Sequence, residues 1–163
     1  MTKAVLDSSV IIALSHTGYL DHLENIFTDP IIPQAVFNEI CIKGHGLIGD
    51  RELRKAVNNR KIRVMKPQNN NLVEALIDPL GIGEAEAIAL AIEENTDYLI
   101  LDDRLARRKA LNMRLPVIGT IRVLKMMYNQ EVLESGSLIA SLNALKEIGF
   151  RISDQVLKKA TET

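Results

Sequence analysis

The chain has 163 residues, which is the usual size of one domain. Hydrophobic residues make up 47% and charged residues 25%, which excludes a disordered or fibrous chain. The 20 Lys and Arg residues nearly balance the 21 Asp and Glu residues, so the net charge of −1 excludes a globally basic nucleic-acid binder. Cys41 is the only cysteine, and no apolar run reaches the roughly 18 residues of a membrane span. We therefore expect a cytoplasmic protein without a membrane segment.

In the first part of the chain, short apolar runs alternate with stretches of helical periodicity. The expected elements, in chain order, are a strand at 4–6, helices at 10–14 and 19–27, a brief strand at 31–32, a helix that opens at Pro33, a helix at 47–60, an edge strand at 61–65 and a polar loop at 67–71.

The second part continues this alternation and then becomes entirely helical. The expected elements are a helix at 84–95, a strand at 97–101, a helix at 104–112, a strand at 115–118, a helix at 120–128, helical structure over 130–148 and a last helix at 155–160. Strands that alternate with helices predict an α/β fold, with a parallel sheet covered on both faces in three α/β/α layers. We expect one domain over residues 1–128, with a helical C-terminal extension over residues 129–163 packed on or beside it.

Aspartates follow two of the predicted strands. Asp7 ends the first strand, and Asp102 and Asp103 end the strand at 97–101. Ligands of parallel α/β sheets bind beyond the carboxyl ends of the strands, so these side chains are expected to lie at one site. The alternative is that each aspartate only caps the helix that follows it.

Glutamates on the predicted helices extend this acidic set. Glu84 shares a helical stripe with Ala87 and Ile88, so it points toward the buried face. Glu86 falls on the other side of that helix, where a solvated position is at least as good an interpretation. Glu39 borders the apolar side of its helix, and the alternative for it is an edge residue that reaches water.

Carboxylates gathered at one end of a sheet repel one another unless a cation lies among them. Oxygen ligands without His or Cys select Mg²⁺ or Mn²⁺ rather than zinc. Such a cluster suits phosphodiester hydrolysis, because bound metal ions activate water and neutralise charge on phosphate oxygens. Arg104, Arg107 and Arg108 follow directly on Asp102 and Asp103, which favours contact with a phosphate-bearing polymer.

Four segments of the chain each place an acid in an apolar context. They are Val5-Leu6-Asp7-Ser8-Ser9-Val10-Ile11-Ile12, Pro33-Gln34-Ala35-Val36-Phe37-Asn38-Glu39-Ile40, Gly81-Ile82-Gly83-Glu84-Ala85-Glu86-Ala87-Ile88-Ala89-Leu90-Ala91 and Leu101-Asp102-Asp103-Arg104-Leu105-Ala106-Arg107. In this order they resemble the four acidic motifs of PIN-domain ribonucleases, and most closely those of small prokaryotic PIN-like proteins grouped with toxins of toxin–antitoxin pairs. The likeness spans about residues 4–124, and residues 149–153 are similar to the helical tail of that subgroup.

The resemblance implies a PIN-like fold and an endonuclease that cleaves single-stranded RNA with Mg²⁺ or Mn²⁺, acting as a toxin. The residues that it implies are the catalytic, metal-binding acids Asp7, Glu39, Glu84 and Asp103, the further ligand Asp102, and the supporting residues Ser9 and Glu86. Glu86 competes with Glu84 for the third position, and the usual Thr-x-Asp of the toxins reads Leu101-Asp102-Asp103 here. The implied partners are RNA and a small antitoxin protein, and whether the chain forms a homodimer is left open.

Three alternative classes of protein share part of this pattern of acids. A phosphoacceptor receiver domain would carry its paired acids after the first strand, whereas here the pair comes late. A phosphatase of the haloacid-dehalogenase type would need aspartate at both positions 7 and 9, and Ser9 fails that requirement. The third alternative is a catalytically weak PIN-like module that binds an antitoxin or RNA.

Overall fold

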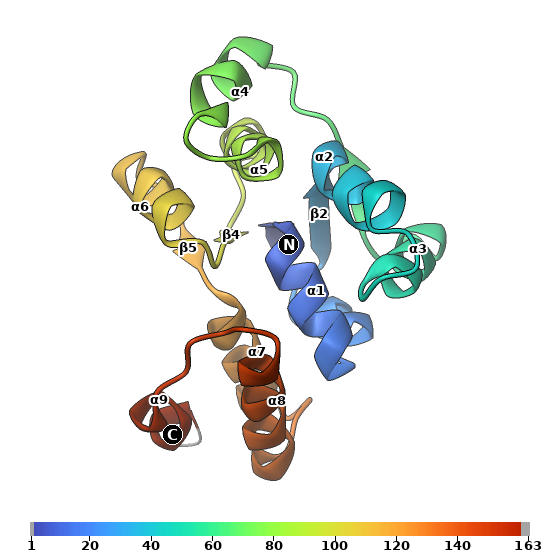
Figure 1. Cartoon of the computed structure of the whole chain (residues 1–163), viewed down its shortest axis with the longest axis vertical. Helices are drawn as coiled ribbons and strands as arrows, with labels where there is room; N and C mark the ends of the chain where they lie inside the picture. The colour runs from blue at the N-terminus through green and yellow to red at the C-terminus, as the bar shows by residue number, and fades with distance from the viewer. Residues whose placement is uncertain (1, 161–163) are drawn as a thin grey trace.

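A computed structural model describes residues 2–160 and contains a sheet of five parallel strands (Figure 1). The strands are β1 (Lys3–Leu6), β2 (Asp29–Pro33), β3 (Arg63–Met65), β4 (Tyr98–Ile100) and β5 (Val117–Ile118). Their order in the sheet is β3-β2-β1-β4-β5, so β1 lies in the centre and pairs with both β2 and β4. The predicted α/β fold with a parallel sheet is confirmed, and so is the edge position of the strand before residue 66.

The helical elements that connect these strands follow the predicted order with two differences. They are α1 (Ser8–Thr17), the 3₁₀-helix η1 (Leu20–Asn25), α2 (Gln34–Phe37), the π-helical turn η2 (Asn38–Lys43), α3 (Asp50–Asn58), α4 (Asn70–Ile77), α5 (Ile82–Glu93), α6 (Arg104–Asn112), α7 (Thr120–Asn129), α8 (Ser135–Glu147) and α9 (Asp154–Ala160). The α-helix expected at 19–27 was wrong, because this segment forms the shorter 3₁₀-helix η1. Helix α4 was missed altogether.

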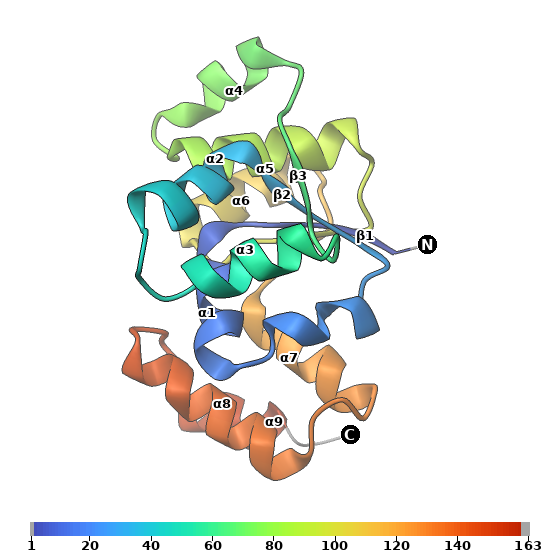
Figure 2. The same ribbon diagram turned by 90° about the vertical axis from the view of Figure 1, so that its right-hand side faces the viewer.

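Each face of the sheet carries its own hydrophobic core, as a parallel sheet covered on both sides requires. Ala4 and Leu6 belong to the core beneath α1, α7 and α8, and Val5 between them belongs to the core beneath α4, α5 and α6. Figure 2 shows these two layers, with α5 above β1 and with α1 and α7 below it. The continuous apolar run of β1 therefore contributes to both cores. Asp7, the polar residue that follows it, lies where the carboxyl ends of the strands meet.

The C-terminal helices share the core of the first layer. Leu138, Leu142 and Leu145 on α8 are fully buried, and α8 packs on α1. The division of the chain at residue 128 stays a prediction, and its outer limits, Met1 and residues 161–163, lie outside the described residues. Within residues 2–160, none of the helices combines the length and the apolar character needed to cross a bilayer.

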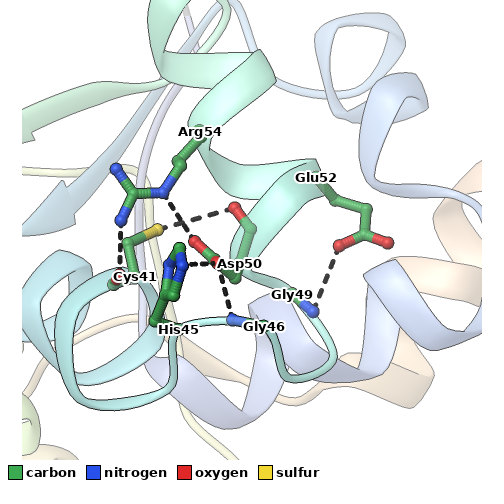
Figure 3. Close-up of polar contacts among 7 residues, drawn as sticks. All are labelled: Cys41, His45, Gly46, Gly49, Asp50, Glu52 and Arg54. Atoms are coloured by element: carbon green, nitrogen blue, oxygen red, sulfur yellow. Dashed lines mark hydrogen bonds and ion pairs between the residues drawn. The ribbon is translucent and has the colours of Figure 1, made fainter.

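Asp50 ties the loop after η2 to the start of α3 (Figure 3). Its carboxylate accepts hydrogen bonds from the Gly46 N–H at 2.8 Å and from Arg54 Nε at 2.7 Å, and His45 Nδ1 lies 3.1 Å away. Arg54 also donates to the carbonyl oxygen of Cys41 in η2. The bonds from Gly46 and Arg54 lower the pKa of Asp50 to about 2. These contacts hold the C-terminal end of η2 and the loop after it against α3.

Candidate active site

Asp7 is the buried centre of the acidic site. It follows β1 and stands at the N-cap of α1, but its side chain makes no capping hydrogen bond and is only 5% exposed. Burial raises the pKa of Asp7 to about 7, although a hydrogen bond from the Ser8 backbone opposes the rise. The negative charges of Glu84, Glu39 and Asp102 raise it further. A buried carboxylate held among other carboxylates destabilises the fold, which is typical of a functional position.

Glu39 reaches the same place from η2. Its side chain is exposed, and its Oε2 accepts a 2.6 Å hydrogen bond from the hydroxyl of Ser8. Gly83 leaves room between the two acids: a Cβ atom at that position would lie 3.3 Å from Glu39 Oε2 and 3.5 Å from Asp7 Oδ1. The two carboxylate oxygens therefore lie close to the same point beside Gly83, which a side chain there would occupy.

Glu84 and Glu86, two residues apart on α5, have different surroundings. Glu84 is half-buried, and burial together with the charges of Asp103 and Glu39 raises its pKa. Glu86 is only 5% exposed, so the solvated interpretation was wrong. Its Oε1 accepts a 3.2 Å hydrogen bond from the N–H of Ala35 at the start of α2. Glu84 thus belongs to the acidic cluster, whereas Glu86 holds the helix that leads into η2.

The aspartates after β4 also divide into two roles. Asp102 accepts a 2.9 Å hydrogen bond from the Thr120 N–H and a second bond from the Thr120 hydroxyl, and the Ser9 hydroxyl lies 3.5 Å from it. Asp103 is exposed and caps α6 by accepting from the Ala106 N–H at 2.9 Å. The capping interpretation therefore holds for Asp103, although this does not remove its charge from the site.

The acidic side chains are oxygen donors of the kind that hard divalent cations prefer, but they are not arranged as a complete metal site. In the described part of the chain, no three Asp, Glu, His or Cys side chains converge closely enough to form a ready-made metal site. Neither Asp7 nor Glu39 nor Glu84 forms an ion pair with a basic side chain of residues 2–160. Carboxylate oxygens near one point, as those of Asp7 and Glu39 are, match the ligand preference of Mg²⁺ or Mn²⁺.

An open cleft of about 1350 Å³ contains these acids. The basic residues on its walls are Lys43, Lys66, Arg104, Arg107 and Arg151. Arg107 also donates to the carbonyl oxygen of Leu101 at 2.8 Å, so part of its function is to hold the loop that carries the aspartates. Arg108 lines an adjoining hollow of about 480 Å³ instead of the cleft. Arg104 and Arg107 line this hollow as well as the cleft, so the three predicted arginines lie together on one surface.

Sequence reasoning missed several residues of this site. Ser8 and Thr120 each donate a hydroxyl to a site carboxylate, and Gly83 keeps the space between two acids open. A signal existed for Thr120, because it begins the helix after the strand at 115–118 and so lies at the same edge of the sheet. No sequence signal placed residues 148–151 on the wall of the cleft, where the structure has them.

The comparison with protein families agrees with the fold. A family model described as a PIN domain matches residues 3–163, which is nearly the whole chain. A search of the curated proteins finds no match. PIN domains are in general nucleases, which are hydrolases of phosphodiester bonds. The chain belongs to the PIN-domain family.

Proposed function

We propose that this protein is a metal-dependent endoribonuclease that cleaves single-stranded RNA. The observation that carries the proposal is buried Asp7 at the floor of an open cleft, with the charges of Glu39, Glu84 and Asp102 acting on it and with arginines on the cleft wall. A carboxylate cluster of this kind suits the binding of a divalent cation, and a bound cation can activate water for attack on a phosphodiester.

The side chains divide into those that would hold the metal and those that position them. Asp7, Glu39, Glu84 and Asp103 would provide the ligands, with Asp102 as a further oxygen donor at the edge. When bound, Mg²⁺ or Mn²⁺ supplies an activated water and neutralises charge on the phosphate oxygens. The Ser8 hydroxyl orients Glu39, and Thr120 orients Asp102. Arg104 on the cleft wall would contact phosphates of the substrate.

The test is cleavage of labelled oligonucleotides by the purified protein in Mg²⁺, in Mn²⁺ and in EDTA. We expect internal cuts in single-stranded RNA with either metal and none in EDTA. Double-stranded RNA and single-stranded DNA serve as comparison substrates in the same conditions. Cleavage that persists in EDTA, or an absence of cleavage with both metals, would contradict the proposal.

The lack of three converging ligands within residues 2–160 favours a second candidate, a PIN-like module that binds RNA or an antitoxin without cutting. Binding of the same oligonucleotides without cleavage in either metal would select this candidate.

The neighbouring glutamates of α5 give a paired prediction. Glu84→Gln is expected to lower the cleavage rate by at least about tenfold, because it removes a charged ligand. Glu86→Gln is expected to cleave within about twofold of the parent, since the Gln carbonyl can still accept from the Ala35 N–H. Initial rates at saturating Mg²⁺ measure both effects, and the opposite ranking would move the third ligand to Glu86.

Arg104 and Arg108 give a second matched pair, because both are exposed on α6 and only Arg104 lines the cleft. Arg104→Gln is expected to weaken RNA binding and to reduce the slope of log K against log salt by about 0.7 unit, the value for one phosphate contact on a single strand. Arg108→Gln is expected to leave the slope unchanged. Equal losses in the two variants would show that α6 acts only through its overall charge.

We also propose that the protein acts as the toxin of a toxin–antitoxin pair and is inhibited by a small protein. Support comes from α6, where Leu105 and Leu111 are 44% and 54% exposed beside hollows next to the cleft. An apolar surface at this place could be covered by a partner that also blocks the cleft. Size-exclusion chromatography with and without such a partner tests this complex and also distinguishes a homodimer from a monomer.

A further inference from the structure

The connection between α8 and α9 forms part of the cleft wall. Ile148, Gly149, Phe150 and Arg151 line the same cleft as Asp7. Figure 1 shows this connection as an extended stretch between the two helices. Residues near the C-terminus of the described chain thus line the cleft that also contains Asp7, the residue after β1.

Hydrogen bonds and packing fix both ends of this stretch. Gly149 has a left-handed backbone (φ 103°), and its N–H donates to the Lys146 carbonyl at 3.1 Å. The Phe150 N–H donates to the Leu145 carbonyl at 3.0 Å, which completes the turn at the end of α8. On the other side, Ile152 is buried, with 8% exposure. Phe150 and Arg151 are therefore held between two anchored points.

The two side chains differ from the rest of the cleft wall. The chain has only three Phe, three Tyr and no Trp, and Phe150 is the aromatic residue among the described residues that line the cleft. It is half-buried, so part of the ring packs on the core and part is accessible. Arg151 is exposed and forms no ion pair within residues 2–160. An aromatic ring beside a free guanidinium is a combination that binds unpaired nucleotides.

We propose that Phe150 and Arg151 form a nucleotide subsite beside the acidic centre, in which the Phe150 ring stacks on an unpaired base and Arg151 contacts a neighbouring phosphate. This subsite rests on the proposed RNA substrate. Such a subsite would favour single strands, since a base that is paired within a duplex cannot be splayed out onto the ring. Arg104 and Arg107 lie on the same cleft wall and would bind further phosphates of that strand.

The test is a double-mutant cycle that combines variants of the protein with modified RNAs. Affinities are measured in Mg²⁺ on an Asp7→Asn background, so that no cleavage interferes, with a fluorescent single-stranded RNA and a series in which each nucleotide in turn is abasic. Phe150→Leu is the test variant because it keeps an apolar side chain against the core, and Phe150→Tyr is the rescue variant because it keeps the ring. Melting temperatures of all variants exclude unfolding.

We expect Phe150→Leu to bind intact RNA about tenfold more weakly, whereas Phe150→Tyr binds like the parent. One abasic position should weaken binding by the parent to a similar extent and cause no further loss in Phe150→Leu. A loss that is the same at every abasic position, or no loss in a folded Phe150→Leu variant, would overturn the stacking role.

Arg151 has its own readout, the salt dependence of binding. Arg151→Gln is expected to reduce the slope of log K against log salt by about 0.7 unit, while Lys55→Gln, exposed on α3 outside the cleft, leaves it unchanged. An unchanged slope in Arg151→Gln would overturn the phosphate contact. RNA that binds the parent but shows no coupling to Phe150 overturns only the subsite, whereas a parent that neither binds nor cleaves RNA overturns the proposed function as well.

Discussion

Replacing Asp7 by asparagine is expected to lower the rate of RNA cleavage by about a hundredfold or more. The side chain keeps its size, and it makes no capping hydrogen bond that the substitution could break. What is lost is the charge at the floor of the cleft, next to Glu39 and Glu84, where a divalent cation would bind. Single-turnover rates in saturating Mg²⁺, with the melting temperature of each protein, measure the effect.

Asp103 provides a second test because its charge can be removed without losing its role as the cap of α6. Asparagine is also a good N-cap, so Asp103→Asn keeps the hydrogen bond from the Ala106 N–H and removes only the charge. We expect reduced cleavage with an unchanged melting temperature. Asp21→Asn, exposed on η1, is expected to cleave like the parent. Full activity in both Asp7→Asn and Asp103→Asn would contradict the proposed active site and would mean that other side chains hold the metal.

The positions of the strand-end acids could be predicted because two simple patterns coincide there. The apolar residues of β1 and β4 predict buried parallel strands, and the next polar residues must then lie at the carboxyl edge of the sheet. Asp7 and Asp102 follow from this argument without any knowledge of side-chain contacts. The register agrees, since Leu6 pairs with Ile100, Asp7 follows Leu6 directly and Asp102 follows Ile100 after one residue, Leu101.

Other features depend on contacts that local sequence does not encode. Helix α4 begins within a run of three asparagines, which predicted a loop, but Asn69 caps the helix by accepting from the Leu72 N–H at 3.1 Å. Periodicity predicts only which residues share a face of one helix, so it placed Glu86 opposite the apolar face and thus toward water. It does not predict that α2 packs against Glu86. The position of Phe150 depends on how α8 packs on α1, which is a long-range contact.

The second large effect concerns the pH dependence of stability. The metal-free protein is expected to become less stable as the pH rises from about 5 to 8. Asp7 has a pKa of about 7 in the folded state and an ordinary value of 3.8, so between these values the folded state holds a proton that the unfolded state releases. Protonation therefore favours the folded state at low pH, and this stabilisation is lost as the pH rises through 7. The pKa values of Glu84 and Glu86 are also raised, so both act in the same direction.

The loss attributable to Asp7 is on the order of 2–4 kcal/mol, because each pKa unit corresponds to about 1.4 kcal/mol. Urea unfolding in EDTA at several pH values measures it. Asp7→Asn should be more stable than the parent at pH 8, and the difference should shrink toward pH 4, where the parent carboxyl becomes protonated in the unfolded state as well. The lowered pKa of Asp50 affects stability only at pH values below about 4, outside this window. Added Mg²⁺ should stabilise the parent at pH 8 far more than the variant, because binding requires the ionised carboxylate. A parent whose stability rises between pH 5 and 8, or a variant less stable than the parent at pH 8, would show that the fold stabilises the Asp7 charge without a cation.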